Sequence, residues 1–367
     1  MSYKTRKELY EQLIAKRNRP LITYVTSIRP GMGASMAGDA IRPLIDQLSL
    51  VPREKREVDF LIVSNGGDPI TSLRMMSLLR ERFDKVSVLL PYVAYSAATV
   101  FSLGADEIIM HPYSNLGPVD PQLSVSHRDD SGNQERLQFS SEDLVNYIDF
   151  LKKDVGLTDQ QHLVSSVQPL IKDVGSLAIG SAKRGQMLSL ALSERMLSSH
   201  ISDQAKVKSI SRALNSSYYH HGYAVGRKEA REIDLPIKEP DEEIESILWS
   251  IWLDYEAEMK CNETFNPINE LLQDPNSANA LKTIPIVNMP ANLPPEVQQA
   301  IFKQIVAQIK SESREALKIS SLIASIESTT MSKAFYNDLS ILYWRDINAN
   351  LSYNITTAPS GWIDYRE

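Results

Sequence analysis

Two adjacent glycines stand where an apolar run gives way to a helical pattern. The segment Asn65-Gly66-Gly67-Asp68 follows the short apolar run 58–65 and precedes residues 70–83, which have a helical period. Glycines let the backbone turn sharply and bring free N–H groups close to a ligand, as an oxyanion hole or a phosphate cradle requires. An ordinary strand-to-helix turn has the same pattern. Neither Gly-x-x-x-x-Gly-Lys-Ser/Thr nor Gly-x-Gly-x-x-Gly occurs here, so a nucleotide site has little support.

A serine and an aspartate occupy two further turns of this kind. Ser96 follows a predicted strand and opens a helix of small residues. It can act as a nucleophile whose neighbouring helix N–H groups stabilise an oxyanion, or simply cap the helix. Asp120 lies in the turn-rich stretch 112–123, directly after another strand. It is either a carboxylate held in a rigid loop or the first residue of an Asx-type turn.

The histidines and the single cysteine give no metal-site pattern. The histidines are at positions 111, 127, 162, 200, 220 and 221, and only the last two are adjacent. No His-x-x-x-His or His-Glu-x-x-His motif occurs, which argues against a zinc hydrolase. Cys261 alone cannot form an intramolecular disulfide or a thiolate cluster for zinc. We therefore expect no metal and no cofactor.

Strands and helices alternate from the N-terminus to Met110. The apolar, β-branched runs predict strands, and segments with apolar residues at helical spacing predict helices between them. Near-continuous apolar strands alternating with helices are typical of an α/β fold with a largely parallel sheet flanked by helices. Ligands of such sheets bind beyond the carboxyl ends of the strands, at the turns after Asn65, Pro91 and Met110. The predicted strands are 21–28, 58–65, 85–90 and 107–110.

The later part of the chain reads as mostly helical. We predict an N-terminal helix in 1–19, a main domain in 20–258 and a mainly helical C-terminal extension in 259–367. The segment 294–326 has a long helical pattern, with apolar residues at positions 297, 301, 305 and 309. This stripe can pack onto its own domain or seal a contact between subunits.

Composition excludes several classes of protein. The chain has 367 residues, of which 43% are hydrophobic, and 39 basic against 46 acidic side chains give a net charge of −7. Such a chain can bury a sizeable core and has no overall charge bias toward nucleic acid. No apolar run reaches the roughly 18 residues of a membrane span, and the basic N-terminus lacks the apolar core of a signal peptide. We expect a cytoplasmic protein without an integral membrane anchor or a nucleic-acid partner.

The order of these turns resembles the Clp protease/crotonase superfamily. Three stretches carry the resemblance, namely 64–69, 94–99 and 104–120. Within the superfamily the chain is most similar to the SDH family (serine dehydrogenase proteinases) of Clp-fold serine proteinases. Gly117 to Gln122 is the most specific match. The resemblance extends over roughly residues 20–258 and implies a Clp protease/crotonase-like fold.

The resemblance also implies roles for particular residues. Ser96 is the implied nucleophile, His221 the general base and Asp120 the acid that orients it. Gly67 and Ala97 would supply the oxyanion N–H groups, with Gly66 as an accessory. A serine hydroxyl needs a base to take its proton and a carboxylate to fix the imidazole, so the residue types suit the chemistry. The family's histidine is followed by aspartate and, two positions further on, proline. Here these positions are Gly222 and Ala224, and His220 is a rival imidazole.

These residues predict a serine peptidase that hydrolyses peptide bonds through an acyl-enzyme on Ser96. One alternative is a Ser–Lys dyad with Lys183 as the base, as in signal peptide peptidases of the same superfamily. Another is a non-catalytic scaffold or binding protein on a crotonase-type fold. The expected partners are a polypeptide substrate and, by resemblance, further copies of the chain in a homo-oligomer. No sequence feature indicates an ATPase partner.

Overall fold

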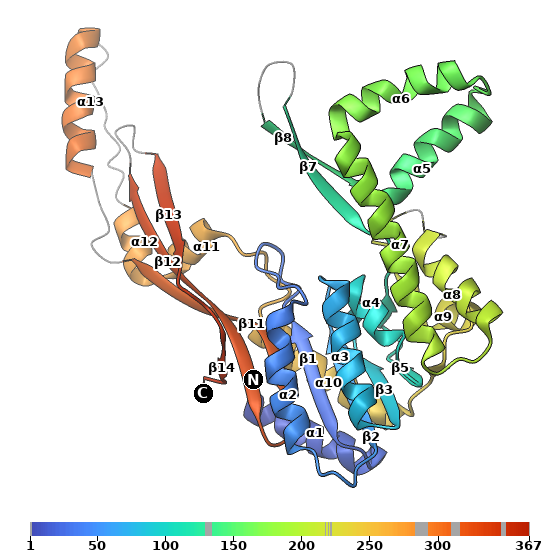
Figure 1. Cartoon of the computed structure of the whole chain (residues 1–367). Helices are drawn as coiled ribbons and strands as arrows, with labels where there is room; N and C mark the ends of the chain where they lie inside the picture. Colours follow the sequence, from blue (N-terminus) through green and yellow to red (C-terminus); the bar gives the residue numbers. More distant parts are fainter. Residues whose placement is uncertain are drawn as a thin grey trace.

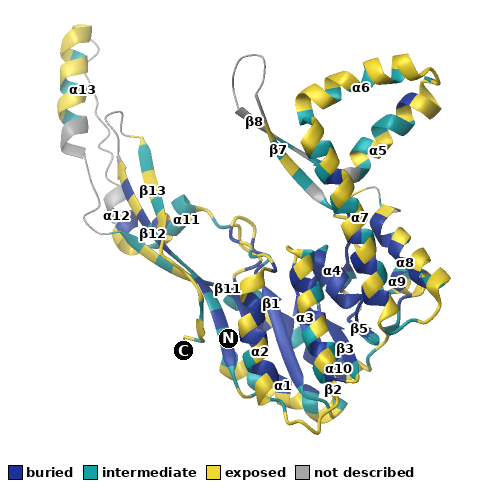
Figure 2. Cartoon of the chain, in the orientation of Figure 1, coloured by how far each residue is buried: buried dark blue, intermediate teal, exposed yellow. Residues whose placement is uncertain are grey.

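A computed structural model gives the structure of the chain. It describes residues 2–128, 134–216, 218, 220, 222–282, 293–309, 316–345 and 350–366. An α/β body carries two long projections, which diverge from its upper side (Figure 1). One projection comprises residues 122–188, and the other is the distal part of the C-terminal extension, residues 259–367. Figure 2 shows that the strands of the body are mostly buried, whereas the helices of both projections are largely exposed.

Nine of the described strands form one sheet, and the half that forms the core of the body is parallel. Its order is β10-β5-β3-β2-β1, and every neighbouring pair runs parallel. All six residues of β1 are buried, because helices cover both faces of the sheet. The α/β architecture predicted from the sequence is therefore confirmed. The strands are β1 (Leu21–Thr26), β2 (Glu57–Val63), β3 (Lys85–Leu90), β5 (Glu107–Met110) and β10 (Ile237–Lys238).

Alternate residues of these strands contribute to two cores. Ile22 and Tyr24 face one helical layer, while Leu21 and Val25 face the other. The first layer consists of α2 (Ile41–Leu50) with the preceding 3-10 turn η1 (Gly38–Ala40), α3 (Pro69–Arg82), α4 (Ala97–Ser102), the end of α7 (Ser176–Ser198), α8 (Gln204–Ser216) and α9 (Arg227–Glu232). The second layer consists of α1 (Tyr3–Arg17) and α10 (Glu242–Glu258).

Two smaller sheets complete the body and the first projection. One has the order β4-β6-β9, with β4 (Val93–Ala94), β6 (Asn115–Leu116) and β9 (Val225–Gly226). The other is a hairpin of β7 (Gln122–Arg128) and β8 (Gln134–Ser140). The projection continues through α5 (Ser141–Asp149), the π-helical turn η2 (Phe150–Asp154) and α6 (Gln160–Val174) into α7.

The prediction of a mainly helical C-terminal extension needs correction. The described residues of the extension form three helices, followed by four strands that extend the main sheet. Within the predicted helix 294–326, residues 317–326 belong instead to strand β11, which pairs antiparallel with β1 from Thr23 to Thr26. Because β1 lies near the opposite end of the sequence, this pairing overrides the local helical pattern. The elements are α11 (Pro267–Gln273), α12 (Pro275–Lys282), α13 (Pro295–Ile309), β11 (Leu317–Glu327), β12 (Ser332–Arg345), β13 (Leu351–Thr357) and β14 (Trp362–Asp364).

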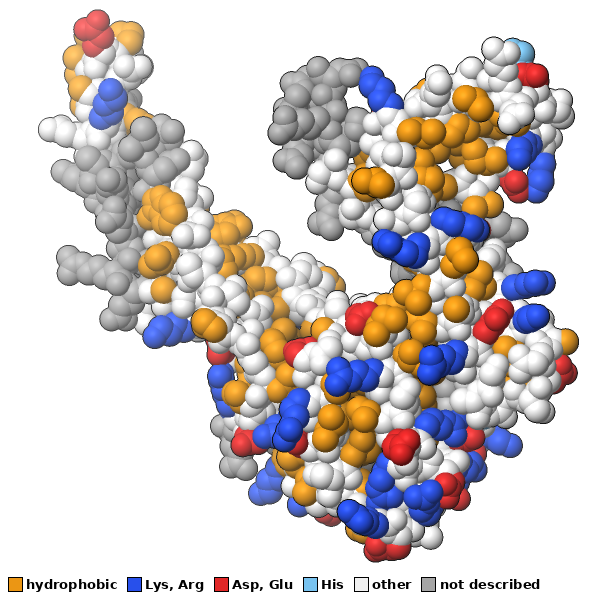
Figure 3. Space-filling model, viewed as in Figure 1, with side chains coloured by type: hydrophobic (Ala, Val, Ile, Leu, Met, Phe, Trp, Pro, Cys, Tyr) orange, Lys and Arg blue, Asp and Glu red, His pale blue; other side chains and the backbone are white. Residues whose placement is uncertain are grey.

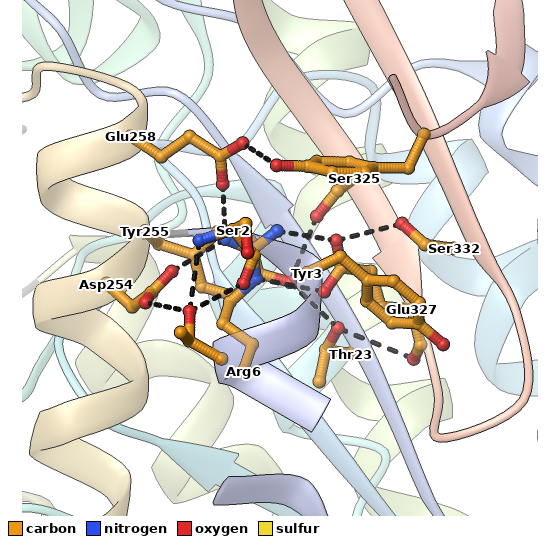
Figure 4. A network of polar contacts seen from close by, with 12 residues as sticks. Ser2, Tyr3, Arg6, Thr23, Asp254, Tyr255, Glu258, Ser325, Glu327 and Ser332 are labelled. Carbon is orange, nitrogen blue, oxygen red and sulfur yellow. Dashed lines mark hydrogen bonds and ion pairs between the residues drawn. The ribbon is translucent and has the colours of Figure 1, made fainter. Parts of the chain in front are cut away.

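A buried arginine connects the N-terminal helix α1 to α10 and to strand β11 of the C-terminal extension (Figure 4). The fully buried Arg6 of α1 donates two hydrogen bonds to Glu327 of β11, at 3.0 and 2.8 Å. It also pairs with Asp254 at 2.8 Å and with Glu258, both on α10. A buried guanidinium is tolerated only when it is paired in this way. Arg6 thus fixes α1, α10 and β11 to one another.

We predict that Arg6→Ala destabilises the fold strongly. Removing one partner of a buried ion pair leaves charge uncompensated and typically costs about 3–5 kcal/mol. Urea denaturation followed by circular dichroism measures this loss. Arg56→Ala is the control, because the Arg56–Asp84 pair is exposed and its loss should leave the denaturation midpoint unchanged. Equal midpoints for wild type and Arg6→Ala would contradict the assigned role.

Candidate active site

The small sheet β4-β6-β9 gathers the segments that the sequence singled out. β4 leads into Ser96, β6 leads into the loop of Asp120, and β9 follows the segment that contains His221. β4 runs parallel to β6, and β6 runs antiparallel to β9. A further parallel bridge joins Ser64, just before the glycine turn, to Ala94 of β4. Four segments far apart in the sequence therefore meet along one short sheet.

Ser96 adopts a strained backbone conformation. Its φ is 52° and its ψ is −116°, immediately before α4. Within the described part of the chain, its hydroxyl makes no capping hydrogen bond to that helix. A non-glycine residue at such angles costs of the order of 1–3 kcal/mol and is found mostly where function requires it. The half-buried serine is thus held in its turn without acting as a helix cap.

The turn at Gly66 lies directly against the turn at Ser96. A Cβ atom on Gly66 would lie 2.5 Å from the carbonyl oxygen of Tyr95, 2.8 Å from Cβ of Ser96 and 2.9 Å from the nitrogen of Ala97. These distances leave no room for a side chain, and the φ of Gly66 is +96°. Glycine is therefore required at position 66 by contact as well as by conformation.

The N–H group of Gly67 points away from its neighbouring strand segment. Met36 bridges Gly67 in parallel, through bonds from Met36 N to Gly66 O at 2.7 Å and from Asp68 N to Met36 O at 2.9 Å. Since the peptide unit is planar and trans, the N–H of Gly67 is directed opposite to the carbonyl of Gly66, away from Met36. The N–H of Ala97 belongs to the first turn of α4, where helical partners are lacking.

A cavity of about 320 Å³ is lined by Ser96, Gly67 and Ala97, among other residues. On its other sides it is largely apolar, with α7 forming one wall. The volume of this cavity is large enough to hold a side chain together with the backbone beside it. Its lining comprises Asn65, Gly67, Pro69, Ser96, Ala97, Val100, Val119, Pro121, Gly185, Leu188 and Ser189.

The loop of Asp120 is fixed relative to Ser96 by buried hydrogen bonds. The Thr99 hydroxyl lies 2.7 Å from the carbonyl oxygen of Ala94 and 2.9 Å from that of Gly117, and it accepts from Gly117 N at 3.1 Å. Ser189 of α7 donates to the carbonyl of Val119 at 2.6 Å. Asp120 itself is 8% exposed. The carboxylate therefore lies on a loop that is joined by buried hydrogen bonds to α4, the helix that follows Ser96.

His221 lies outside the described residues, but the chain on both sides of it is anchored. Val119 N donates to the carbonyl of Leu214, near the end of α8, at 3.0 Å. On the other side of the histidine, Val225 pairs with Leu116. Both ends of the segment between α8 and β9 are thus attached to the chain that leads to Asp120. His220 is exposed, and its Nδ1 accepts a hydrogen bond from Gly222 N at 3.0 Å.

Lys183 lies on α7 but borders a different cavity. It is exposed, and its Nζ donates to Gln186 Oε1 at 3.1 Å. The cavity that it lines has a volume of about 360 Å³ and lies between α5 and α7. The structure therefore does not bring Lys183 together with Ser96 around one cavity.

Other reactive groups of the body have local roles. Burial lowers the pKa of His111, whose Nδ1 accepts from Tyr113 N at 3.1 Å. Burial likewise lowers the pKa of His200, which bonds the carbonyl of Leu103 through Nε2 at 2.9 Å. Burial raises the pKa of the Cys261 thiol, so the reactive thiolate is disfavoured. None of these three side chains lines the cavity beside Ser96 as the described residues define it.

The described residues contain neither a metal-site cluster nor a helix that could span a membrane. No group of three or more histidine, cysteine, aspartate or glutamate side chains is arranged to hold a metal ion there. In the same ranges, no helix combines the length and the apolar character needed to cross a bilayer.

Sequence reasoning did not assign roles to several residues that position the site. Thr99 and Ser189 hold the loop of Asp120, and Met36 holds the glycine turn. Thr99 lies within the stretch 94–99, and a hydroxyl among small residues there could have indicated a structural role. Met36 lies in an irregular stretch whose partner, Gly67, belongs to another segment beyond α2 and β2, and no local pattern reveals it.

We predict that the strain at Ser96 can be measured as stability. Ser96→Gly relieves the positive φ, whereas Ser96→Ala retains a Cβ atom and the strain. The glycine variant should therefore exceed the alanine variant by about 1 kcal/mol in free energy of unfolding. Denaturant melts of both variants test this. A glycine variant that is no more stable than the alanine variant would show that the turn is unstrained.

Comparison with known proteins places the chain near one family of proteinases. Residues 41–129 match the family described as ClpP-like SDH-type serine proteinase. The chain is similar to SDH-type serine proteinases. This confirms the resemblance found in the sequence. The matched range contains the glycine turn, Ser96 and Asp120 and ends before the segment of His221.

Two curated relatives come from Methanocaldococcus jannaschii. The uncharacterized protein MJ0137 is 24% identical over 194 residues, which are 53% of this chain and 57% of that protein. The uncharacterized protein MJ1495 is 35% identical over 80 residues, which are 22% of this chain and 27% of that protein. The chain thus matches about half of the length of one relative and about a quarter of the other.

Solved structures with a detectable likeness include two proteases. A variant of the 1510-N membrane-bound stomatin-specific protease has a TM-score of 0.34 and 11% identity, covering 60% of this chain and 79% of that one. ClpP1 from Listeria monocytogenes has a TM-score of 0.33 and 12% identity, covering 64% of this chain and 99% of that one. Likenesses at this level do not specify a substrate or an assembly.

Proposed function

We propose that the protein is a serine peptidase that hydrolyses peptide bonds through an acyl-enzyme on Ser96. The observation that carries the proposal is the contact between the turns of Gly66 and Ser96. Ser96, whose backbone is strained, lines one cavity together with Gly67 and Ala97, and this supports an oxyanion hole formed by the N–H groups of these two residues. A nucleophile beside two N–H donors is the arrangement that acyl transfer requires.

The chemistry follows from these positions. Ser96 Oγ attacks the scissile carbonyl carbon while a base takes its proton, and the oxyanion accepts hydrogen bonds from Gly67 and Ala97. The intermediate then collapses as the base returns the proton to the departing amine, leaving an ester on Ser96. Water, activated by the same base, hydrolyses this ester and restores the serine.

We assign the role of general base to His221, and we assign to Asp120 the role of orienting the imidazole. The support is the anchoring of both flanks of His221 to the chain that leads to Asp120. A lysine base must be desolvated to lose its proton near neutral pH, whereas Lys183 is exposed beside another cavity. The strain at Ser96, in the absence of a capping bond among the described contacts, favours an enzyme over a scaffold.

We further propose a polypeptide substrate and self-association. The apolar walls formed by Val100, Val119 and Leu188 suit an apolar side chain next to the scissile bond. In the projection of residues 122–188, α6 buries none of its described residues, and Leu177 at the start of α7 is 87% exposed. Hydrophobic side chains are visible on both projections in Figure 3. Exposed hydrophobic side chains on the projection of residues 122–188 also include Phe150, Val164 and Met187, and an exposed group of this kind supports an interaction site.

A fluorophosphonate should label the wild-type protein once, at Ser96. Intact-mass spectrometry and peptide mapping would locate the adduct, because only an activated serine reacts readily with this reagent. Ser96→Ala should abolish labelling. Ser77→Ala, which changes an exposed serine on α3, is the matched control and should label normally. Folded wild-type protein that remains unlabelled would favour the scaffold alternative.

The identity of the base can be tested by single substitutions. His221→Ala should lower the labelling rate by about 10²–10⁴-fold, which is the usual contribution of a general base. His220→Ala and Lys183→Ala serve as controls and should label at the wild-type rate. A fully active His221→Ala variant would exclude the triad, and a loss confined to Lys183→Ala would establish the dyad instead.

A further inference from the structure

The glycine turn is held by a loop that precedes α2. Met36 makes both backbone bonds to the turn, with Gly66 and with Asp68. It lies within residues 27–40, which connect β1 to α2 and which we call the Met36 loop. Gly66 and Gly67 have no side chains of their own to fix their conformation, and glycine populates many backbone conformations. The direction of the Gly67 N–H therefore depends on where the Met36 loop is held.

One end of the Met36 loop is attached to the C-terminal extension through a buried arginine. Arg29 is 3% exposed; its Nε donates to the carbonyl of Glu263 and its Nη2 to Glu270 Oε1, both at 3.0 Å. Its guanidinium carbon lies 5.3 Å from the centre of the Phe265 ring. Phe265 N also donates to the carbonyl of Pro30 at 2.8 Å. A planar guanidinium bound on two edges fixes direction as well as distance.

The other end of the same loop is attached near the C-terminus. Trp362 of β14 donates from Nε1 to Asp39 Oδ2 at 2.9 Å. Asp39 follows Met36 closely along the chain, in η1. The Trp362 ring also lies against Tyr24 and Phe335, with centroid distances of 6.4 and 5.7 Å. Met36 therefore lies between two residues of its loop, Arg29 and Asp39, that both bind the C-terminal extension.

We infer that the C-terminal extension positions the oxyanion turn, with Arg29 as a positioning residue that acts through Met36. This inference rests on the proposed function, because it assigns Gly67 the role of an oxyanion donor. The extension lies beyond the residues that match the proteinase family, yet it holds the loop to which the glycine turn is bonded. Small errors in the position of a catalytic group cost large factors in rate, so even a slight release of the loop slows acylation.

The test compares Arg29→Ala and Arg29→Lys with Arg80→Ala as the matched control. Arg80 also binds a carboxylate and a carbonyl, those of Asp106 and Gly104, but it lies at the far end of α3. Arg29→Ala should slow fluorophosphonate labelling of Ser96 by roughly 10- to 100-fold. Arg29→Lys should recover part of the rate, since a lysine can pair with Glu270 but supplies no planar fork for both acceptors. Arg80→Ala should label at the wild-type rate.

Hydrogen exchange gives a readout that does not depend on activity. In Arg29→Ala, the amides of Met36 and Asp68 should exchange faster, because they form the bonds between the loop and the turn. Unchanged exchange, or a loss of labelling that Arg80→Ala shares, would overturn the inference. If wild-type protein is not labelled at Ser96, the proposed function fails, and the exchange of these amides still decides whether the extension holds the turn. Should Arg29→Ala not fold, Trp362→Phe removes the second attachment and is judged by the same criteria.

Discussion

The pairing of β6 with β4 on one side and β9 on the other is the constraint on which the candidate site depends. In the described structure, β6 consists of Asn115 and Leu116, and these two residues are in register with both neighbouring strands. Because each strand is so short, the residues just beyond its ends cannot diverge far from one another. Ser96, Asp120 and the flanks of His221 are such residues. Thr99 and Val119 form further hydrogen bonds between the same segments. Several independent contacts therefore fix the distances between these segments.

Close packing at the glycine turn explains why strain can persist at Ser96. The turn of Gly66 occupies the space beside Tyr95 and Ala97, and the turn of Ser96 has no room to relax toward it. Strained conformations survive only where their surroundings determine them more strongly than their own preference does. Here the determinants are the main sheet beneath, the Met36 loop on one side and α4 on the other. The backbone conformation at Ser96 is therefore set by the packing of neighbouring segments rather than by the preference of the serine itself.

The C-terminal extension is an integral part of the body. Its strand β11 completes the main sheet against β1, and Glu327 at the end of β11 receives the buried guanidinium of Arg6. The first and last parts of the chain thus lie together beside α10. The same extension also reaches the Met36 loop through Glu270 and Trp362. The extension therefore contributes both to the stability of the body and to the position of the glycine turn at Gly66.

The sequence by itself determined the features that local patterns encode. Apolar runs and helical spacing predicted the strands and helices up to Met110, and the turn residues around Gly66, Ser96 and Asp120 marked the candidate site. The role of His221 remains a prediction, as the residue lies outside the described ranges. Only the tertiary structure decided which turns touch, that β11 is a strand, and that Met36 and Arg29 support the site. Each of these depends on a partner in a distant segment of the chain, and contacts between distant segments leave no periodic trace in the sequence.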